Sequence, residues 1–289
     1  MRKPQTAYLL LLPFFALMVL VLWACGNVLV HSLGYVPAFG LTRLTLQYFA
    51  AALSRPDVLS AIGISLRIAL FSSILAAVLG TLLCAALVGQ GHTHGGFLTL
   101  VRLPILVPHT VAALFIVLLF SQTGLLARCA AALGIIDDFS AFPQLLYTAG
   151  STGTILAYLW KEIPFVAYFS LALMASVNST LGEAAQNLGA SHTRSFFTVT
   201  LPLSLPAVLQ AFLIIFLFAF GGYELPYLLG ATLPKALPVY AYLSYMSPDL
   251  KQRPYAMAIF AIILLLSAAM AALYLLLTRR LMKKLGGAA

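Results

Sequence analysis

Four ionisable side chains interrupt apolar runs that are long enough to cross a membrane: Arg67, Lys161, Glu162 and Glu224. A charged residue at the centre of a membrane helix costs about 2.5 to 3.5 kcal/mol on insertion scales. Such residues therefore face protein or water rather than lipid, and they often mark the path of a polar solute or ion. We expect the four side chains to line or close a hydrated region within the membrane.

Two specific pairings are predicted among these residues. Lys161 and Glu162 are adjacent, so their side chains point about 100° apart on a helix and each needs a partner elsewhere. Counted from the expected outer ends of the spans, Arg67, Lys161 and Glu224 lie at depths of roughly 9, 12 and 6 Å, which is one layer. We predict that Glu162 pairs with Arg67 and that Lys161 pairs with Glu224. The alternative is that these residues snorkel to the interface or form purely structural ion pairs.

A second feature is the polar loop at residues 178–206, which separates two strongly apolar segments. Ser179 or Thr180 is expected to cap a short helix there, and Pro202 is expected to end it. A short helix is marginal in water, so it needs a surface to lie against. Small residues give this segment a smooth face for close approach and Phe196 gives it an apolar one, while Glu183 lies in its first turn and Leu201-Pro202 follow it; the small residues are Ala184, Ala185, Gly189 and Ala190.

The composition sets the class of protein. Of 289 residues, 62% are hydrophobic and 8% are charged, whereas a soluble domain has roughly 25% charged residues. The chain is therefore a membrane protein. Its formal charge of +9 does not indicate a nucleic-acid partner, because basic residues of membrane proteins collect in loops that face the cytoplasm and anionic lipid.

Six apolar segments are predicted to span the lipid bilayer: 7–30, 61–88, 103–121, 153–177, 207–229 and 255–277. Together with the loop at 178–206 they form one transmembrane domain over residues 1–289, an all-α helical bundle. The first segment follows Arg2 and Lys3 as a signal peptide does, but its apolar character continues to Val30, so we expect a retained membrane helix. A further short helix is expected at residues 45–53.

An even number of spans places both termini on the same side of the membrane, which we expect to be the cytoplasm. Basic residues are slightly more numerous on that side, chiefly because of the tail that contains Arg279, Arg280, Lys283 and Lys284.

The spacing within the polar loop resembles that of a known family. Residues 183–189 read E-A-A-x-x-x-G, and Leu201-Pro202 follow after an aromatic pair. This pattern resembles the cytoplasmic loop of the permease subunits of binding-protein-dependent ABC importers, which have a MetI-like fold. One mild departure is that His192 and Arg194 lie between Gly189-Ala190 and the aromatic pair. The segments WKEIPF at 160–165 and GGYELP at 221–226 are similar to permeases grouped with polyamine, ferric iron, sulfate and aminophosphonate importers.

The resemblance implies a set of partners and a location. A coupling helix in the loop would dock on one of two separate ATPase subunits, which bind ATP and Mg, so this chain would need no cofactor of its own. A second permease, expected to be a different chain, would complete the pathway, and an external binding protein would deliver the substrate. The location would be the bacterial inner membrane, and the substrate a small polar or charged solute: polyamine-like, an aminophosphonate or an inorganic ion.

Other functional motifs are missing from the sequence. Every lysine follows a residue other than glycine, so there is no G-K-[ST] phosphate loop. His92 and His94 lack a third ligand, and His31, His109 and His192 stand alone, so no metal site is expected. We therefore expect a transport subunit without an enzymatic site. The alternative is a stand-alone secondary transporter or a membrane-embedded enzyme, for which proton-relay acids would be needed, and acids are few.

Overall fold

The computed structural model describes residues 4–286, and it is helical over most of that range. An isolated bridge between Val36 and Leu41 is the nearest approach to a sheet among these residues, so the predicted all-α fold is confirmed. The α-helices are α1 (Pro4–Ser32), α2 (Gln47–Leu53), α3 (Pro56–Gly89), α4 (Gly96–Leu106), α5 (His109–Phe120), α6 (Leu125–Ala132), α7 (Thr152–Val177), α8 (Glu183–Asn187), α9 (His192–Ser195), α10 (Leu201–Gly221), α11 (Glu224–Leu229), α12 (Leu237–Tyr245) and α13 (Arg253–Gly286). Short 3₁₀ helices are η1 (Pro37–Phe39), η2 (Phe139–Ala141) and η5 (Leu250–Gln252), and two π-helical turns are η3 (Asn178–Gly182) and η4 (Phe196–Thr200).

Six helical segments within the described residues are long and apolar enough to cross a membrane, as the sequence predicts. The helix expected at residues 45–53 is present as α2. Arg2 and Lys3, which precede the first predicted span, lie outside the described residues. Side chains 11–23 of α1 are almost all exposed and apolar on every face of the helix, a pattern that suits contact with lipid.

Two of the predicted spans have the wrong boundaries. The third, predicted at 103–121, is broken between α4 and α5, because Pro108 caps α5 and holds Val107 in an extended conformation. The fifth, predicted at 207–229, ends at Gly221, and extended backbone at Gly222 separates α10 from α11. Both breaks expose backbone groups that the continuous helices would have satisfied internally.

The chain groups into two compact units. One comprises Met1–Leu59 and Tyr240–Leu266, and the other comprises Ser60–Val239 and Ser267–Ala289. The expectation of a single domain over 1–289 stays a prediction. In the first unit, two cation–π contacts involve α13: the Arg253 guanidinium at its start lies 4.0 Å from the ring centre of Tyr245 at the end of α12, and the Arg55 guanidinium lies 5.7 Å from the ring centre of Tyr255.

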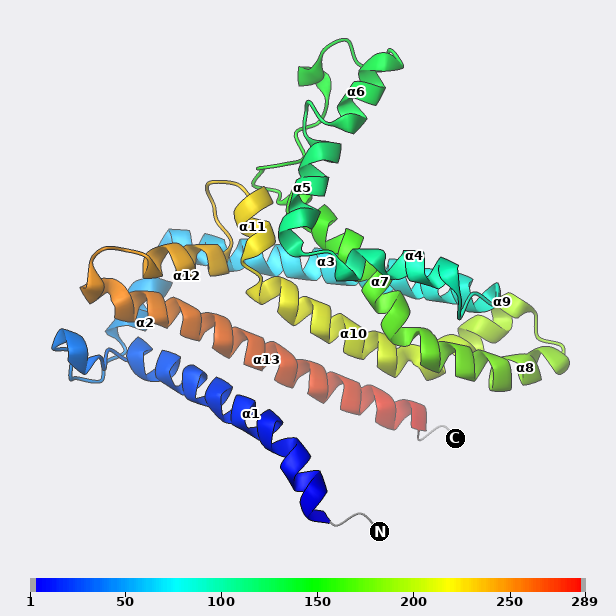
Figure 1. The fold of residues 1–289 in the computed structure, drawn as a ribbon, viewed down its shortest axis with the longest axis horizontal. Helices are drawn as coiled ribbons and strands as arrows, with labels where there is room; N and C mark the ends of the chain where they lie inside the picture. The colour runs from blue at the N-terminus through cyan, green and yellow to red at the C-terminus, as the bar shows by residue number, and fades with distance from the viewer. Residues whose placement is uncertain (1–3, 287–289) are drawn as a thin grey trace. The chain divides into compact units, whose positions relative to one another are not determined.

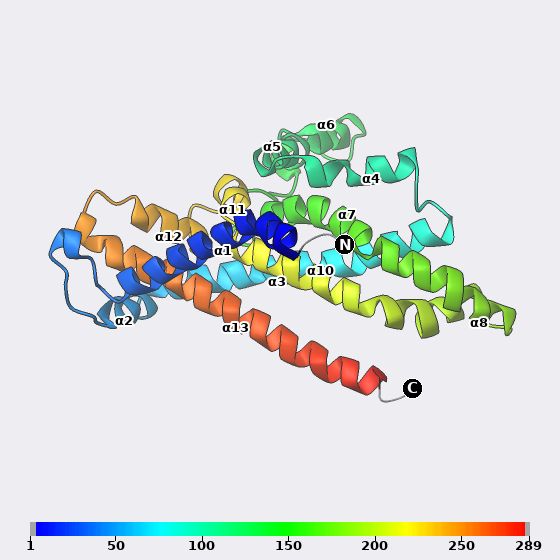
Figure 2. The ribbon, with the colours of Figure 1, turned by 60° about the horizontal axis from the view of Figure 1, so that its bottom comes forward.

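The second unit is built around α7, which packs against α10, α4 and α5 (Figure 2). One core cluster joins α3, α4 and α7, and a second joins α3, α7 and α10; their buried members are Cys84, Leu87, Leu98, Ala167, Leu171 and Met174 in the first and Ala76, Val166, Ala211 and Ile215 in the second. Gly80 lets α3 approach α7 closely, since a Cβ added there would lie 2.7 Å from the carbonyl oxygen of Ile163. This unit contains both candidate sites.

Candidate functional site

The polar loop at 178–206 is a helical hairpin that continues α7 and α10. One arm runs from α7 through η3 and α8 to Asn187, and the other runs from α9 through η4 into α10 (Figure 1). The predicted cap at Ser179 or Thr180 is wrong, because both hydroxyls donate to the carbonyl oxygen of Ser176 within the continuing helix. The predicted stop at Pro202 is also wrong: the wider π turn η4 precedes it, and the helix continues to Gly221.

The turn of the hairpin is a Schellman cap at the end of α8. Gly189 has a φ of +94°, its N–H donates to the Gln186 carbonyl at 2.9 Å, and the N–H of Ala190 donates to the Ala185 carbonyl at 3.1 Å. Ser191 then starts α9, and its hydroxyl accepts from the N–H of Arg194 at 3.3 Å. Gly189, the last residue of the E-A-A-x-x-x-G pattern, therefore adopts a left-handed backbone conformation that L residues rarely adopt.

Four residues that the sequence analysis did not select hold the two arms together. The Ser195 hydroxyl is buried and donates to the Gly182 carbonyl at 2.8 Å, and the Thr200 hydroxyl lies 3.5 Å from the Asn178 side-chain oxygen. A Cβ on Gly182 would lie 3.1 Å from oxygens of both Asn178 and Thr200. Gly182, directly before Glu183, is the residue from which the sequence could have indicated this close contact between the arms, because small residues mark close helix contacts.

The tip of the hairpin is exposed. Leu188 is 90% exposed, and Glu183, Ala184 and Gly189 are also exposed. Ala185, Ala190, Leu201 and Pro202 are half-buried. The tip is therefore the part of the hairpin that a second surface can reach.

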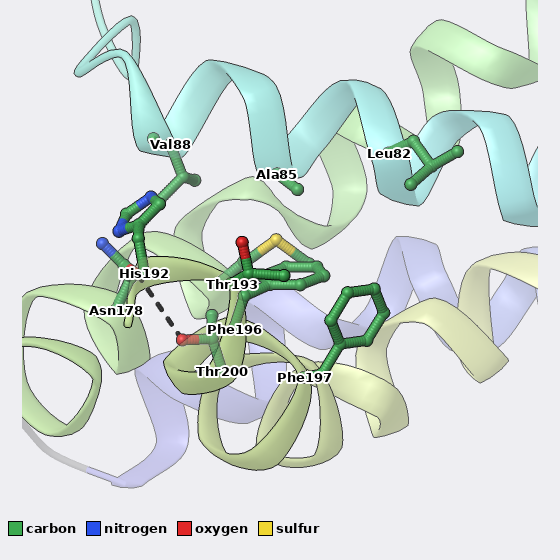
Figure 3. A pocket seen from close by; sticks show the side chains of 11 residues that line it. Leu82, Ala85, Val88, Asn178, His192, Thr193, Phe196, Phe197 and Thr200 are labelled. Carbon is green, nitrogen blue, oxygen red and sulfur yellow. Dashed lines mark hydrogen bonds between the residues drawn. The ribbon is translucent and has the colours of Figure 1, made fainter. Parts of the chain in front are cut away.

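The two phenylalanines of the loop differ in their surroundings. Phe196 is half-buried and packs against the cluster that contains Cys84 and Leu87, whereas Phe197 is exposed. Both line a cavity of about 260 Å³ between the hairpin and the C-terminal end of α3 (Figure 3). His192 borders the same cavity beside Gly89. Phe196 thus connects the hairpin to the bundle rather than forming an outer face.

The intramembrane charges find partners other than those predicted. Arg67 donates to the carbonyl oxygen of Ala149 at 3.0 Å, and Lys161 donates to the carbonyl oxygen of Val107 at the break between α4 and α5. The predicted pairs, Glu162 with Arg67 and Lys161 with Glu224, are both wrong, because neither lies within ion-pair distance in the described residues. Instead, Nδ1 of His109 lies 3.9 Å from Oε2 of Glu224.

Glu224 is not inside the fifth span. It is the first residue of α11, beyond the break at Gly222, and its side chain is 56% exposed. Glu162 is the opposite case, because it is 5% exposed and neither carboxylate oxygen has a hydrogen-bond partner among the described residues. The Ser72 hydroxyl lies nearby on α3 and donates to the Ala69 carbonyl at 3.4 Å.

Two neighbouring cavities bring three of these residues together with three others. The first, of about 230 Å³, is lined by Lys161 and Glu162, and the second, of about 430 Å³, is lined by Glu224. His109, Tyr158 and Phe218 border both cavities. Arg67 borders neither. His109 and Tyr158 were missed because a single histidine or tyrosine in an apolar run carries no spacing signal.

Comparison with known proteins adds a family and a fold. Residues 77–283 match the family of binding-protein-dependent transport system inner membrane components. The chain is 28% identical over 172 residues to the putrescine transport system permease of Escherichia coli, covering 59% of this chain and 56% of that protein. It is 30% identical over 229 residues to the sn-glycerol-3-phosphate transport system permease of Yersinia pseudotuberculosis, a match that covers 74% of this chain and 72% of that protein.

A solved structure has a similar fold. It is a bacterial ABC transporter involved in the import of the acidic polysaccharide alginate, and it superposes with a TM-score of 0.74 at 20% identity over 96% of each chain. The putrescine permease match spans little more than half of that relative's length. The two curated relatives are named for solutes of opposite charge, so the comparison does not define a substrate.

Proposed function

The chain belongs to the family of inner membrane components of binding-protein-dependent transport systems, and on this basis we propose that it is the permease subunit of an ABC importer. The observation that carries the proposal is the capped hairpin of residues 178–200, whose tip exposes Leu188 and whose neck is fixed to the bundle. In this proposal the hairpin is the mechanical input of the transporter, and the chain has no ATPase or other enzymatic site of its own.

The hairpin docks on a separate ATPase subunit in this mechanism. Glu183, Ala184 and Gly189 are exposed at the tip, where a second surface can approach. Closure of an ATPase pair would displace the tip, and the two arms would carry that displacement into α7 and α10, since both arms are helical up to the turn. Phe196 would carry part of it to α3 and α7 through the buried cluster that it contacts.

The cavities around His109 form this chain's share of the translocation path in the same proposal. A second permease, which we propose is a different chain, completes the path, two ATPases bind below, and an extracytoplasmic binding protein delivers a small polar or charged solute. Both termini then face the cytoplasm of a bacterial cell, and the hairpin lies on that side. Rocking of the helices around the site would expose it alternately to either face.

Cysteine labelling and crosslinking test the proposal. Cys129 is native and exposed on α6; with both termini in the cytoplasm, the third of the six spans runs outward, so we propose that α6, which follows α5, lies outside and Cys129 serves as an internal control. In the Ala190→Cys variant, we expect the new thiol to react with membrane-impermeant maleimide only in inside-out vesicles, and Cys129 only in intact cells.

After Cys129→Ser, a bifunctional maleimide on Ala190→Cys should trap a nucleotide-hydrolysing subunit in native membranes. Labelling of position 190 from outside, or crosslinking that never includes such a subunit, contradicts the proposal.

A further inference from the structure

The smaller cavity of the second unit contains a buried acid that nothing in the described chain satisfies. Both oxygens of Glu162 lack any hydrogen-bond partner, although the side chain is 5% exposed. Isolated buried carboxylates are strongly destabilising, so they are usually paired or neutralised. We infer that this cavity binds the ammonium group of a small organic cation, which donates to Glu162. This inference rests on the proposed function, because the ligand would be the transported solute.

The neighbouring groups do not supply the missing partner. Lys161 lines the same cavity, but its amine donates to the Val107 carbonyl and makes no ion pair with Glu162 among the described residues, and His109 lies beside Glu224 rather than Glu162. Ser72 could turn toward Glu162, but one hydroxyl satisfies one of about four acceptor positions on a carboxylate. A bound proton would neutralise the acid and could be donated to the Ser72 oxygen, but the second carboxyl oxygen would still lack a donor, so an ammonium ion that displaces the proton satisfies more of the site.

The walls of the cavity suit an alkyl ammonium ion. Ile105, Ile214 and Ile215 provide apolar surface for a short carbon chain. Phe218 provides an aromatic ring, with the Tyr158 ring 6.5 Å away in an edge-on arrangement and the His109 ring 5.1 Å away. Aromatic faces attract cations by about 0.5 to 2 kcal/mol, depending on desolvation. Two carboxylates, Glu162 and Glu224, border the two neighbouring cavities, against one lysine, Lys161, whose amine is held at the Val107 carbonyl.

Binding to the purified full chain in lipid nanodiscs tests the inference without any ATPase. Butylamine and butyrate are matched probes, since they share a four-carbon chain and carry opposite charges at pH 7. A ligand that binds the folded state raises the unfolding temperature in a saturable way. We expect butylamine to do so for the unmodified protein and butyrate not to. The Glu162→Gln variant should lose the shift, whereas Asp137→Asn, which changes an exposed acid that lines neither cavity, should keep it.

A second measurement does not depend on a variant that folds. An apolar carbodiimide should label Glu162, as detected by mass spectrometry, and butylamine should protect the residue in proportion to its binding. The inference is overturned by the absence of a saturable butylamine shift, by an equal shift in Glu162→Gln, by a larger shift with butyrate, or by labelling that butylamine leaves unchanged. Any of these results would leave the importer proposal intact, because that proposal is tested by crosslinking at position 190.

Discussion

Gly189→Ala tests whether the backbone of the hairpin turn matters for coupling. The chain offers a matched control, because α3 ends in the same type of cap. There the N–H of His92 donates to the Leu87 carbonyl at 2.8 Å, and Gly91 has a φ of +72°. A Cβ added at Gly189 or at Gly91 would meet nothing within 4 Å. Either substitution therefore perturbs the backbone conformation alone, without a steric clash.

The expected cost is modest and calculable. The left-handed conformation costs an L residue about 1 to 2 kcal/mol. Alanine offsets about 0.4 to 1 kcal/mol of this cost, because it lowers the conformational entropy of the chain when the cap is open. The net destabilisation of the cap is about 1 kcal/mol, which corresponds to roughly a fivefold larger opening constant.

Hydrogen exchange at the amide of Ala190 reports this opening, because that amide donates to Ala185 across the cap. Exchange there should be about fivefold faster in Gly189→Ala and unchanged in Gly91→Ala. Substrate-stimulated ATP hydrolysis by the assembled transporter should fall only in Gly189→Ala. Unchanged exchange at Ala190 would refute the role given to the cap. An equal loss of hydrolysis in both variants would show that the effect is general instability rather than a property of the hairpin.

Three further substitutions test the packing. Gly80→Ala places a Cβ 2.7 Å from backbone and side-chain atoms of α7. It should destabilise the protein by about 1 to 3 kcal/mol and so lower the unfolding temperature. The control Gly63→Ala, whose Cβ would have nothing within 4 Å, should leave the unfolding temperature unchanged or raise it. Gly222→Ala should destabilise through a Cβ 2.1 Å from the Tyr158 hydroxyl, and Tyr158→Phe in the same chain should recover part of the loss in thermal melts. Ser195→Ala removes the buried bond across the hairpin neck and should cost about 1 kcal/mol in denaturant unfolding; a cost near zero would argue against that bond.

Hydropathy alone was sufficient to locate six spans, because each apolar run exceeds the length that crosses a bilayer. It could not locate the breaks within them. Val107-Pro108 and Gly222 lie in apolar surroundings, where the average over a window conceals a single residue that ends a helix. Proline and glycine are also tolerated inside membrane helices, so their presence does not by itself predict a break.

The ionisable residues were found from the sequence, but their partners were not. Pairing depends on the rotation of each helix about its axis, and the acceptors of Arg67 and Lys161 are backbone carbonyls, which carry no sequence signature. The polar loop at 178–206 shows the same limit. Gly189 was selected for its small size, whereas the close approach of the two arms occurs at Gly182.

The length of the α7 arm has a mechanical consequence. Residues Thr152–Asn187 form one helical stretch of 36 residues, about 54 Å at 1.5 Å per residue, against a hydrocarbon layer about 30 Å thick. Such a rod acts as a lever: a sideways push of about 5 Å at its tip tilts it by about 5°. Lys161 and Glu162 are less than a third of the way from its far end. With that end as the pivot, the same push would tilt the cavity wall by the full angle but would move these two residues by less than a third of the displacement of the tip.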